Sequence, residues 1–78
     1  MKVLLFMARG FFGSNMYLIY SGNEAAVIDP SMKYEVAAAQ IAENDLKVKY
    51  IILTHAHFDH MLEINDWVEK TNATVIIG

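Results

Sequence analysis

The chain has no cysteine among its 78 residues, which excludes disulfide bonds and metal sites built from thiolates. Basic residues are few: six Lys and Arg are scattered along a chain of net charge -3, which argues against a nucleic-acid-binding surface. No stretch approaches the ~20 apolar residues that cross a membrane. The apolar segment after Lys2 is short and is interrupted by Arg9, unlike a secretion signal. We therefore expect a cytoplasmic protein.

Apolar side chains, in contrast, are abundant. The chain is 55% hydrophobic and its mean hydropathy is +0.27. A chain of this length buries only about 60–65% of its unfolded surface. We therefore expect either an unusually apolar core or an apolar face that a partner covers. No repeat, low-complexity stretch or interdomain linker divides the chain, so residues 1–78 are expected to form one domain.

The hydrophobic pattern predicts five strands and two helices. The strands are expected at Val3–Ala8, Met16–Tyr20, Ala25–Ile28, Val48–Leu53 and Thr74–Ile77, and the helices at Lys33–Asn44 and Met61–Lys70. Strands that alternate with helices indicate the α/β class, with a mixed sheet whose later strands run parallel. Ligand sites in such sheets collect at the carboxyl ends of strands.

Local signals place the ends of these elements. Ser21-Gly22-Asn23 predicts a hairpin turn, and Pro30 ends the strand before it. Ser31 is the predicted N-cap of the first helix, and Asn44-Asp45 ends that helix. The expected buried stripes are Tyr34, Ala37, Ala38, Ile41 and Ala42 on the first helix and Met61, Ile64, Trp67 and Val68 on the second.

All three histidines of the chain lie within residues 55–60, together with one aspartate. Imidazole nitrogens and a carboxylate are typical ligands of zinc, iron and manganese. His55 and His57 are two residues apart, so in an extended segment both point to one side. Asp59 and His60 follow on another side, which suggests a second ion ~3.5–4 Å away and a shared water whose pKa both ions lower.

A structural interpretation competes for Asp59, because this residue also stands where the N-cap of the second helix would be. Both roles can hold at once. For the cluster as a unit, no structural need requires three imidazoles at this spacing, so metal ligation is the favoured interpretation.

The segment Ile52–His60, with the sequence I-L-T-H-A-H-F-D-H, resembles the signature of the metallo-β-lactamase fold superfamily. Ser14–Ile19 and Val27–Pro30 are similar to family segments in their order and spacing. The resemblance implies the amino-terminal half of an αββα sandwich, with helices on one face of a mixed sheet. Residues 1–78 would then be a single incomplete domain. Ser31 departs from the glycine common in this family, and Met61 from its small residues.

By this resemblance, His55 and His57 would bind the first metal, and Asp59 and His60 the second. Asp59 would also act in catalysis by orienting the attacking water. Asp29 would lie beside the site and orient a ligand, although a simple turn residue ahead of Pro30 is an equal alternative. The family implies two zinc ions in the full-length fold, and iron or manganese would also suit these ligands.

The implied function is metal-dependent hydrolysis, in which hydroxide attacks the acyl carbon of a small ester or thioester, as in glyoxalase-II-like enzymes. A flavodiiron-type oxidoreductase is the less favoured variant. The amidohydrolase superfamily also has His-x-His on a strand, but Asp59-His60 and the preceding hairpin argue against it. The remaining family ligands come from beyond Gly78. We therefore expect the chain to be a fragment that is inactive in isolation.

A second hypothesis is that the chain is a catalytically inactive half-domain that associates with itself. The strands Val3–Ala8, Val48–Leu53 and Thr74–Ile77 have sequences typical of burial on both faces. Without the second half of the fold, one face of the sheet would need another cover. A homodimer through that face is the simplest way to provide it.

Overall fold

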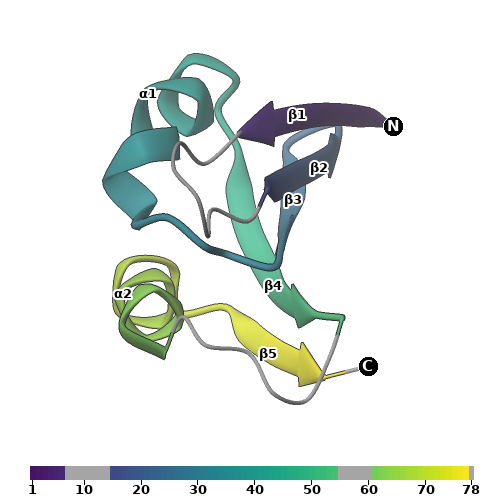
Figure 1. The fold of residues 1–78 in the computed structure, drawn as a ribbon. Helices are drawn as coiled ribbons and strands as arrows, with labels where there is room; N and C mark the ends of the chain where they lie inside the picture. The colour runs from purple at the N-terminus through teal and green to yellow at the C-terminus, as the bar shows by residue number, and fades with distance from the viewer. Residues whose placement is uncertain (7–14, 55–60, 78) are drawn as a thin grey trace.

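The computed structural model describes residues 1–6, 15–54 and 61–77. These residues form one five-stranded sheet, in which the strands lie in the order of the sequence, and two helices (Figure 1). The strands are β1 (Lys2–Phe6), β2 (Met16–Ser21), β3 (Glu24–Ile28), β4 (Lys47–Leu53) and β5 (Thr74–Ile77); the helices are α1 (Tyr34–Glu43) and α2 (Met61–Thr71).

The sheet is mixed, as the sequence predicts. β2 pairs antiparallel with β1 and β3, whereas β4 pairs parallel with β3 and β5. A helix connects each parallel pair, α1 between β3 and β4 and α2 between β4 and β5, because parallel neighbours need a crossover. The α/β class is therefore confirmed. β1 ends at Phe6, and the last two residues of the predicted first strand lie outside the described residues.

The predicted hairpin joins β2 to β3 through a two-residue turn. Ser21 pairs with Glu24, which leaves Gly22 and Asn23 between the strands. Gly22 has φ +62°, a left-handed value that glycine adopts without strain, and this pattern matches a type II′ turn. An added Cβ would meet nothing within 4 Å, so backbone conformation rather than space explains the glycine.

Both helices pack on the same face of the sheet, and the core lies between them and the strands (Figure 1). Trp67 of α2 and Ala37 of α1 are fully buried there, against the strand side chains Leu18, Val27 and Ile51. The remaining buried members of this core are Met16, Ala25, Ile41, Val48, Leu53 and Ile64. Neither helix in the described part of the chain is long and apolar enough to cross a bilayer.

Residues 44–46 end α1 as predicted. The Asp45 N–H donates to the Ala42 carbonyl, and the Leu46 N–H donates to the Ile41 carbonyl at 2.9 Å. With Asp45 at φ 51°, these two hydrogen bonds form a Schellman motif. Leu46 then packs against the core, so the end of the helix directs the chain into β4.

The start of α1 differs from the prediction. Lys33, rather than Ser31, occupies the N-cap, and its side chain makes no capping hydrogen bond. The reason is a contact from the second helix: the Tyr34 N–H donates to Asp66 Oδ2 of α2 at 2.9 Å. A carboxylate distant in sequence therefore satisfies a backbone donor that a local cap would otherwise take.

The prediction of burial is wrong for two residues of the helix stripes. Met61 is 58% exposed, because the packed stripe of α2 is centred on Ile64, Trp67 and Val68 and the first residue of the helix lies outside it. Ala42 is also exposed, in the last turn of α1. The other predicted positions are buried or half-buried.

The prediction that three strands are buried on both faces is also wrong. Val3 of β1 is 58% exposed and Tyr50 of β4 is 46% exposed, and every residue of β5 is exposed. For β1 and β4, the physical reason is that both helices cover the same face of the sheet. β5 is an edge strand, and its residues are exposed on both faces. Within the described ranges, the opposite face has no covering layer.

This one-sided burial yields a first prediction. Ile51→Val removes a methylene from a fully buried position and should lower the free energy of unfolding by about 1 kcal/mol. Ile76→Val makes the same change at a position that is 43% exposed and should cost less than about 0.5 kcal/mol. Urea denaturation followed by circular dichroism measures both. Equal losses would contradict the assignment of the core to one face.

Candidate functional site

The carboxyl ends of β3 and β4 lie side by side, because Ile28 pairs with Ile52 in parallel register. Asp29 follows β3 directly, and Thr54 follows β4 directly. The two residues therefore leave the sheet at the same edge. In an α/β fold this edge is where ligand sites form.

Three hydrogen bonds join Asp29 to β4 and to the residue after it. The Asp29 N–H donates to the Ile52 carbonyl at 2.9 Å. The Asp29 carboxylate accepts from the Thr54 N–H at 2.9 Å and from the Thr54 hydroxyl at 2.6 Å, through different oxygens. We call this arrangement the Asp29–Thr54 clasp.

The backbone conformation of Asp29 explains how the clasp forms. Its φ is 50°, in the left-handed region, which aspartate tolerates better than most residues. Pro30 follows and cannot donate a backbone hydrogen bond, so β3 cannot continue. The turn leaves the carboxylate within hydrogen-bonding distance of Thr54, across the end of the sheet. The clasp therefore fixes the direction in which the chain leaves β4.

Helix α2 makes contacts with the segment that joins β3 to α1. The indole Nε1–H of Trp67 donates to the Met32 carbonyl at 2.7 Å, and Asp66 accepts from the Tyr34 N–H. The rings of Tyr34 and Trp67 are also in edge-to-face contact, with centroids 5.2 Å apart and planes at 82°. α2 is thereby fixed against the segment that joins β3 to α1.

Asp66 also lies 3.6 Å from the ammonium group of Lys70, one turn further along α2. This pair keeps a cation near the carboxylate that receives the Tyr34 N–H. Segment 29–34 is therefore attached at one end to Thr54 and at the other end to α2. Residues 55–60 connect these two anchored points in the sequence.

The predicted ligands His55, His57, Asp59 and His60 lie outside the described residues, and so does the N-cap alternative for Asp59. Among residues 1–6, 15–54 and 61–77, no group of three or more His, Cys, Asp or Glu could hold a metal. The donor set itself fits zinc, iron or manganese, because it consists of imidazoles and a carboxylate with no thiolate. In the sequence, this donor set begins at His55, directly after Thr54.

For Asp29, the two interpretations made from the sequence are compatible with the same geometry. The residue occupies a turn ahead of Pro30, and its carboxylate is used by Thr54. Its role toward a metal ligand stays a prediction. Thr54 belongs to the quoted signature, but the sequence alone gave it no role.

Asp66 and Trp67 were missed as parts of this arrangement. Sequence reasoning placed Trp67 in the core and gave Asp66 no role. Their partners Tyr34 and Met32 are 32 and 35 residues away. No local sequence motif predicts contacts between residues so far apart in the sequence. The only available signal was that a buried tryptophan needs a hydrogen-bond acceptor for its N–H.

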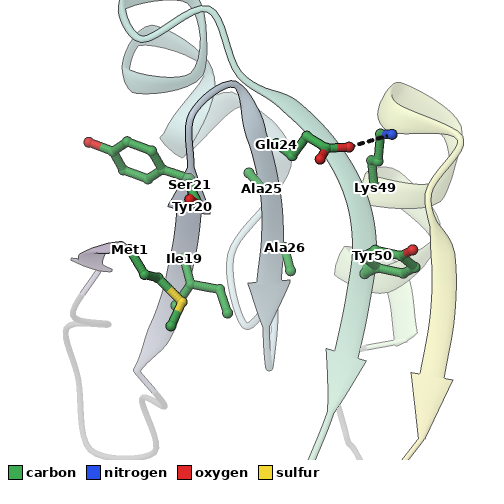
Figure 2. Close-up of a pocket in the computed structure, with 9 residues that line it drawn as sticks. All are labelled: Met1, Ile19, Tyr20, Ser21, Glu24, Ala25, Ala26, Lys49 and Tyr50. Atoms are coloured by element: carbon green, nitrogen blue, oxygen red, sulfur yellow. Dashed lines mark ion pairs between the residues drawn. The ribbon is translucent and has the colours of Figure 1, made fainter.

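A depression of about 280 Å³ lies elsewhere, on the face of the sheet opposite the helices. Figure 2 shows Ile19, Ala26 and Tyr50 on neighbouring strands at its floor, with Glu24 and Lys49 at one end. Its lining is mostly apolar, and the Lys49 ammonium group lies 2.5 Å from the Glu24 carboxylate. It offers no cluster of ligands for a metal.

The ion pair at the end of the depression changes the titration of both partners. The hydrogen bond from Lys49, and then its charge, lowers the pKa of Glu24 below its ordinary value. The same pair raises the pKa of Lys49. Both side chains are well exposed, so solvent screens the interaction.

Comparison with known proteins finds relatives that are named as metal-dependent hydrolases. The model of the metallo-beta-lactamase superfamily matches residues 9–78. A UPF0173 metal-dependent hydrolase of Flavobacterium johnsoniae is 38% identical over 66 residues, which are 85% of this chain and 29% of that protein. A protein of the same description from Staphylococcus aureus (strain Newman) is 33% identical over 70 residues, 90% of this chain and 30% of that protein.

A solved structure is also similar. The crystal structure of the BLEG-1 B3 metallo-beta-lactamase superposes with a TM-score of 0.75 and 27% sequence identity, over 95% of this chain and 35% of that one. The chain thus spans about three tenths of the length of the curated relatives it matches.

The clasp yields a second prediction. Thr54→Val keeps the shape of the side chain but removes the hydroxyl, leaving one Asp29 oxygen without its partner at 2.6 Å. We expect a loss of about 1–2 kcal/mol in the free energy of unfolding, together with faster hydrogen exchange at the Thr54 amide. Urea denaturation and NMR hydrogen exchange measure these effects. Thr54→Ser, which keeps the hydroxyl, is the matched control, and an equal loss in both variants would count against the clasp.

A third prediction concerns the exposed ion pair. Lys49→Gln should raise the pKa of Glu24 toward its ordinary value, because both the hydrogen bond and the charge are lost. Lys47→Gln should raise it less, because Lys47 acts on Glu24 only through charge. Since the folded pKa of Glu24 is lowered, its stabilising effect is present above the unfolded pKa and disappears as the pH falls. NMR titration of the Glu24 carboxylate measures the shifts; no change in Lys49→Gln would contradict the pairing.

Proposed function

Because the chain belongs to the metallo-beta-lactamase superfamily, we propose that it forms the metal-binding amino-terminal part of a metal-dependent hydrolase. The observation that carries this proposal is the Asp29–Thr54 clasp, which lies one residue before a cluster of three histidines and an aspartate. The names of the curated relatives are consistent with it. In this proposal, residues 1–78 are one incomplete domain of the longer fold.

The roles of the side chains follow from the donor set. His55 and His57 bind one metal ion, and Asp59 and His60 bind a second. Zinc is the proposed metal, and iron or manganese would suit the same ligands. When bound, such ions lower the pKa of water, so that hydroxide is available near neutral pH, and polarise the bond under attack.

Asp59 is the proposed catalytic residue, because a carboxylate beside the reacting water can accept its hydrogen bond and orient it. Asp29 is proposed as a positioning residue, which acts through Thr54 rather than on the substrate. By holding the Thr54 N–H and hydroxyl, it fixes the backbone from which His55 extends, which limits the positions the imidazole can take. The proposed substrates are small esters or thioesters, whose acyl carbon hydroxide attacks.

The isolated chain is expected to be inactive. A catalytic zinc site commonly has three protein ligands for each ion. All three histidines of the chain are already used in the proposed assignment, two on one ion and one on the other. The chain therefore supplies two ligands for each ion. We expect it to bind metal weakly and to leave the position of a bound substrate undefined.

Metal titration of the 78-residue chain tests the proposal, with cobalt absorption and zinc competition against a chromogenic chelator as readouts. We expect weak, saturable binding. His57→Ala should lower the affinity about tenfold or more, because one ion loses half of its protein ligands. Thioester hydrolysis by the loaded chain should not exceed that of the metal alone.

Glu69→Gln is the matched control, since it removes an exposed carboxylate of α2 outside the motif. Its affinity for metal should equal that of the unsubstituted chain. Absence of cobalt or zinc uptake at saturating metal would overturn the proposal. So would uptake that His57→Ala leaves unchanged, because binding would then arise from other carboxylates.

A further inference from the structure

Helix α2 holds the segment between β3 and α1 through two successive residues. Asp66 accepts a hydrogen bond from the Tyr34 N–H at 2.9 Å, and Trp67 donates its indole N–H to the Met32 carbonyl at 2.7 Å. The donor lies on the segment in the first contact and on the helix in the second. Because none of these groups can exchange its role as donor or acceptor, the pair favours one alignment of α2 with the segment. We call these two hydrogen bonds the α2 bridge.

The α2 bridge adds a directional constraint that core packing lacks. Ile64 and Trp67 are buried between α2 and the sheet, and burial of apolar surface stabilises this packing without a preferred direction. A hydrogen bond weakens steeply when its geometry is distorted, so the bridge opposes sliding and rotation of the helix. The core therefore holds α2 on the sheet, and the bridge sets its position along the sheet.

The acceptor for the first N–H of α1 comes from outside that helix. Lys33 is the N-cap and makes no side-chain hydrogen bond, whereas Asp, Asn, Ser or Thr at this position would cap the helix locally. Asp66 takes that role although it is 32 residues away from Tyr34. Its negative charge also suits the positive end of α1. A local cap would stabilise α1 alone, but a cap from α2 makes the position of each helix depend on the other.

The α2 bridge affects residues 55–60 because α2 begins directly after them. Met61 is the first residue of α2, and Asp66 and Trp67 lie in its second turn. A short helix moves as a rigid element, so the bridge also fixes the point where the chain enters α2. At the other end, Thr54 is held by Asp29. One short segment, residues 29–34, therefore holds both ends of the stretch that carries the predicted ligands.

We propose that Asp66 is a positioning residue for the metal site. By fixing α2 against residues 29–34, it sets the distance between the two ends of residues 55–60 and so raises the affinity for metal. The inference rests on the proposed function, because the proposed ligands lie in that stretch. Asp66 binds no metal itself. It reduces the number of arrangements from which a bound ion must select one, and this preorganisation favours binding.

Cobalt titration of the 78-residue chain tests this role with variants that separate the acceptor from the charge. Asp66→Ala removes the acceptor, and we expect the affinity for cobalt to fall about three- to tenfold, the scale on which contacts outside a site act on it. Asp66→Asn keeps an acceptor oxygen without the charge and should keep most of the affinity. Glu69→Ala is the matched control, an exposed carboxylate on the same helix, and should leave the affinity unchanged.

A second measurement needs no metal. In Asp66→Ala, the Thr54 amide should exchange its hydrogen faster than in Glu69→Ala, because the segment that carries Asp29 loses its support from α2. NMR hydrogen exchange measures this difference, and circular dichroism checks that each variant folds. If Asp66→Ala does not fold, Asp66→Ser withdraws the acceptor with a shorter polar side chain.

The outcomes separate this inference from the proposed function. Unchanged cobalt affinity or unchanged Thr54 exchange in folded Asp66→Ala would overturn the positioning role, and the proposed function would stand if His57→Ala still weakened binding. An equal loss in Asp66→Asn would identify Asp66 as a ligand, and an equal loss in Glu69→Ala would identify an effect of charge alone; either result would overturn the positioning role. Absence of metal uptake by the unsubstituted chain would overturn the proposed function and this inference together.

Discussion

The parallel pairing of β3 with β4 is the constraint on which the proposed site depends. It places Ile28 beside Ile52, so that Asp29 and Thr54 leave the sheet at one edge and their side chains can meet. A shift of one residue would turn the Asp29 carboxylate to the other face, because side chains alternate along a strand. The Asp29–Thr54 clasp and the point from which His55 extends both follow from this register.

The packing of α2 in the core also holds the segment that follows β3. Trp67 is fully buried, yet its indole N–H needs an acceptor, and the Met32 carbonyl provides one at 2.7 Å. The neighbouring Asp66 accepts the first N–H of α1. The same residues of α2 thus pack against the sheet and hold the segment after β3 in position. A substitution that weakened the packing of Trp67 would therefore also weaken its hydrogen bond to Met32 and so disturb the segment that carries Asp29, although it would change no predicted ligand.

The sequence could predict the elements because each has a local signal: apolar runs for the strands, Ser21-Gly22-Asn23 for the hairpin, and Asn44-Asp45 for the end of α1. It could not predict what depends on distant contacts. Ser31 was wrong as the N-cap because Asp66 supplies the acceptor from α2. Burial of strands on both faces was wrong because an apolar run does not say how many layers cover it. The histidine motif could be read locally because its ligands are close in sequence.

The uncovered face of the sheet and the proposed ligand set place different demands on whatever completes them. Apolar burial is non-directional, so any surface of matching shape can cover Tyr50 and its neighbours. Metal coordination requires particular donors in particular directions. The proposed assignment uses all three histidines of the chain and leaves each ion with two protein ligands. A layer that covered the sheet would therefore not by itself complete the proposed catalytic site.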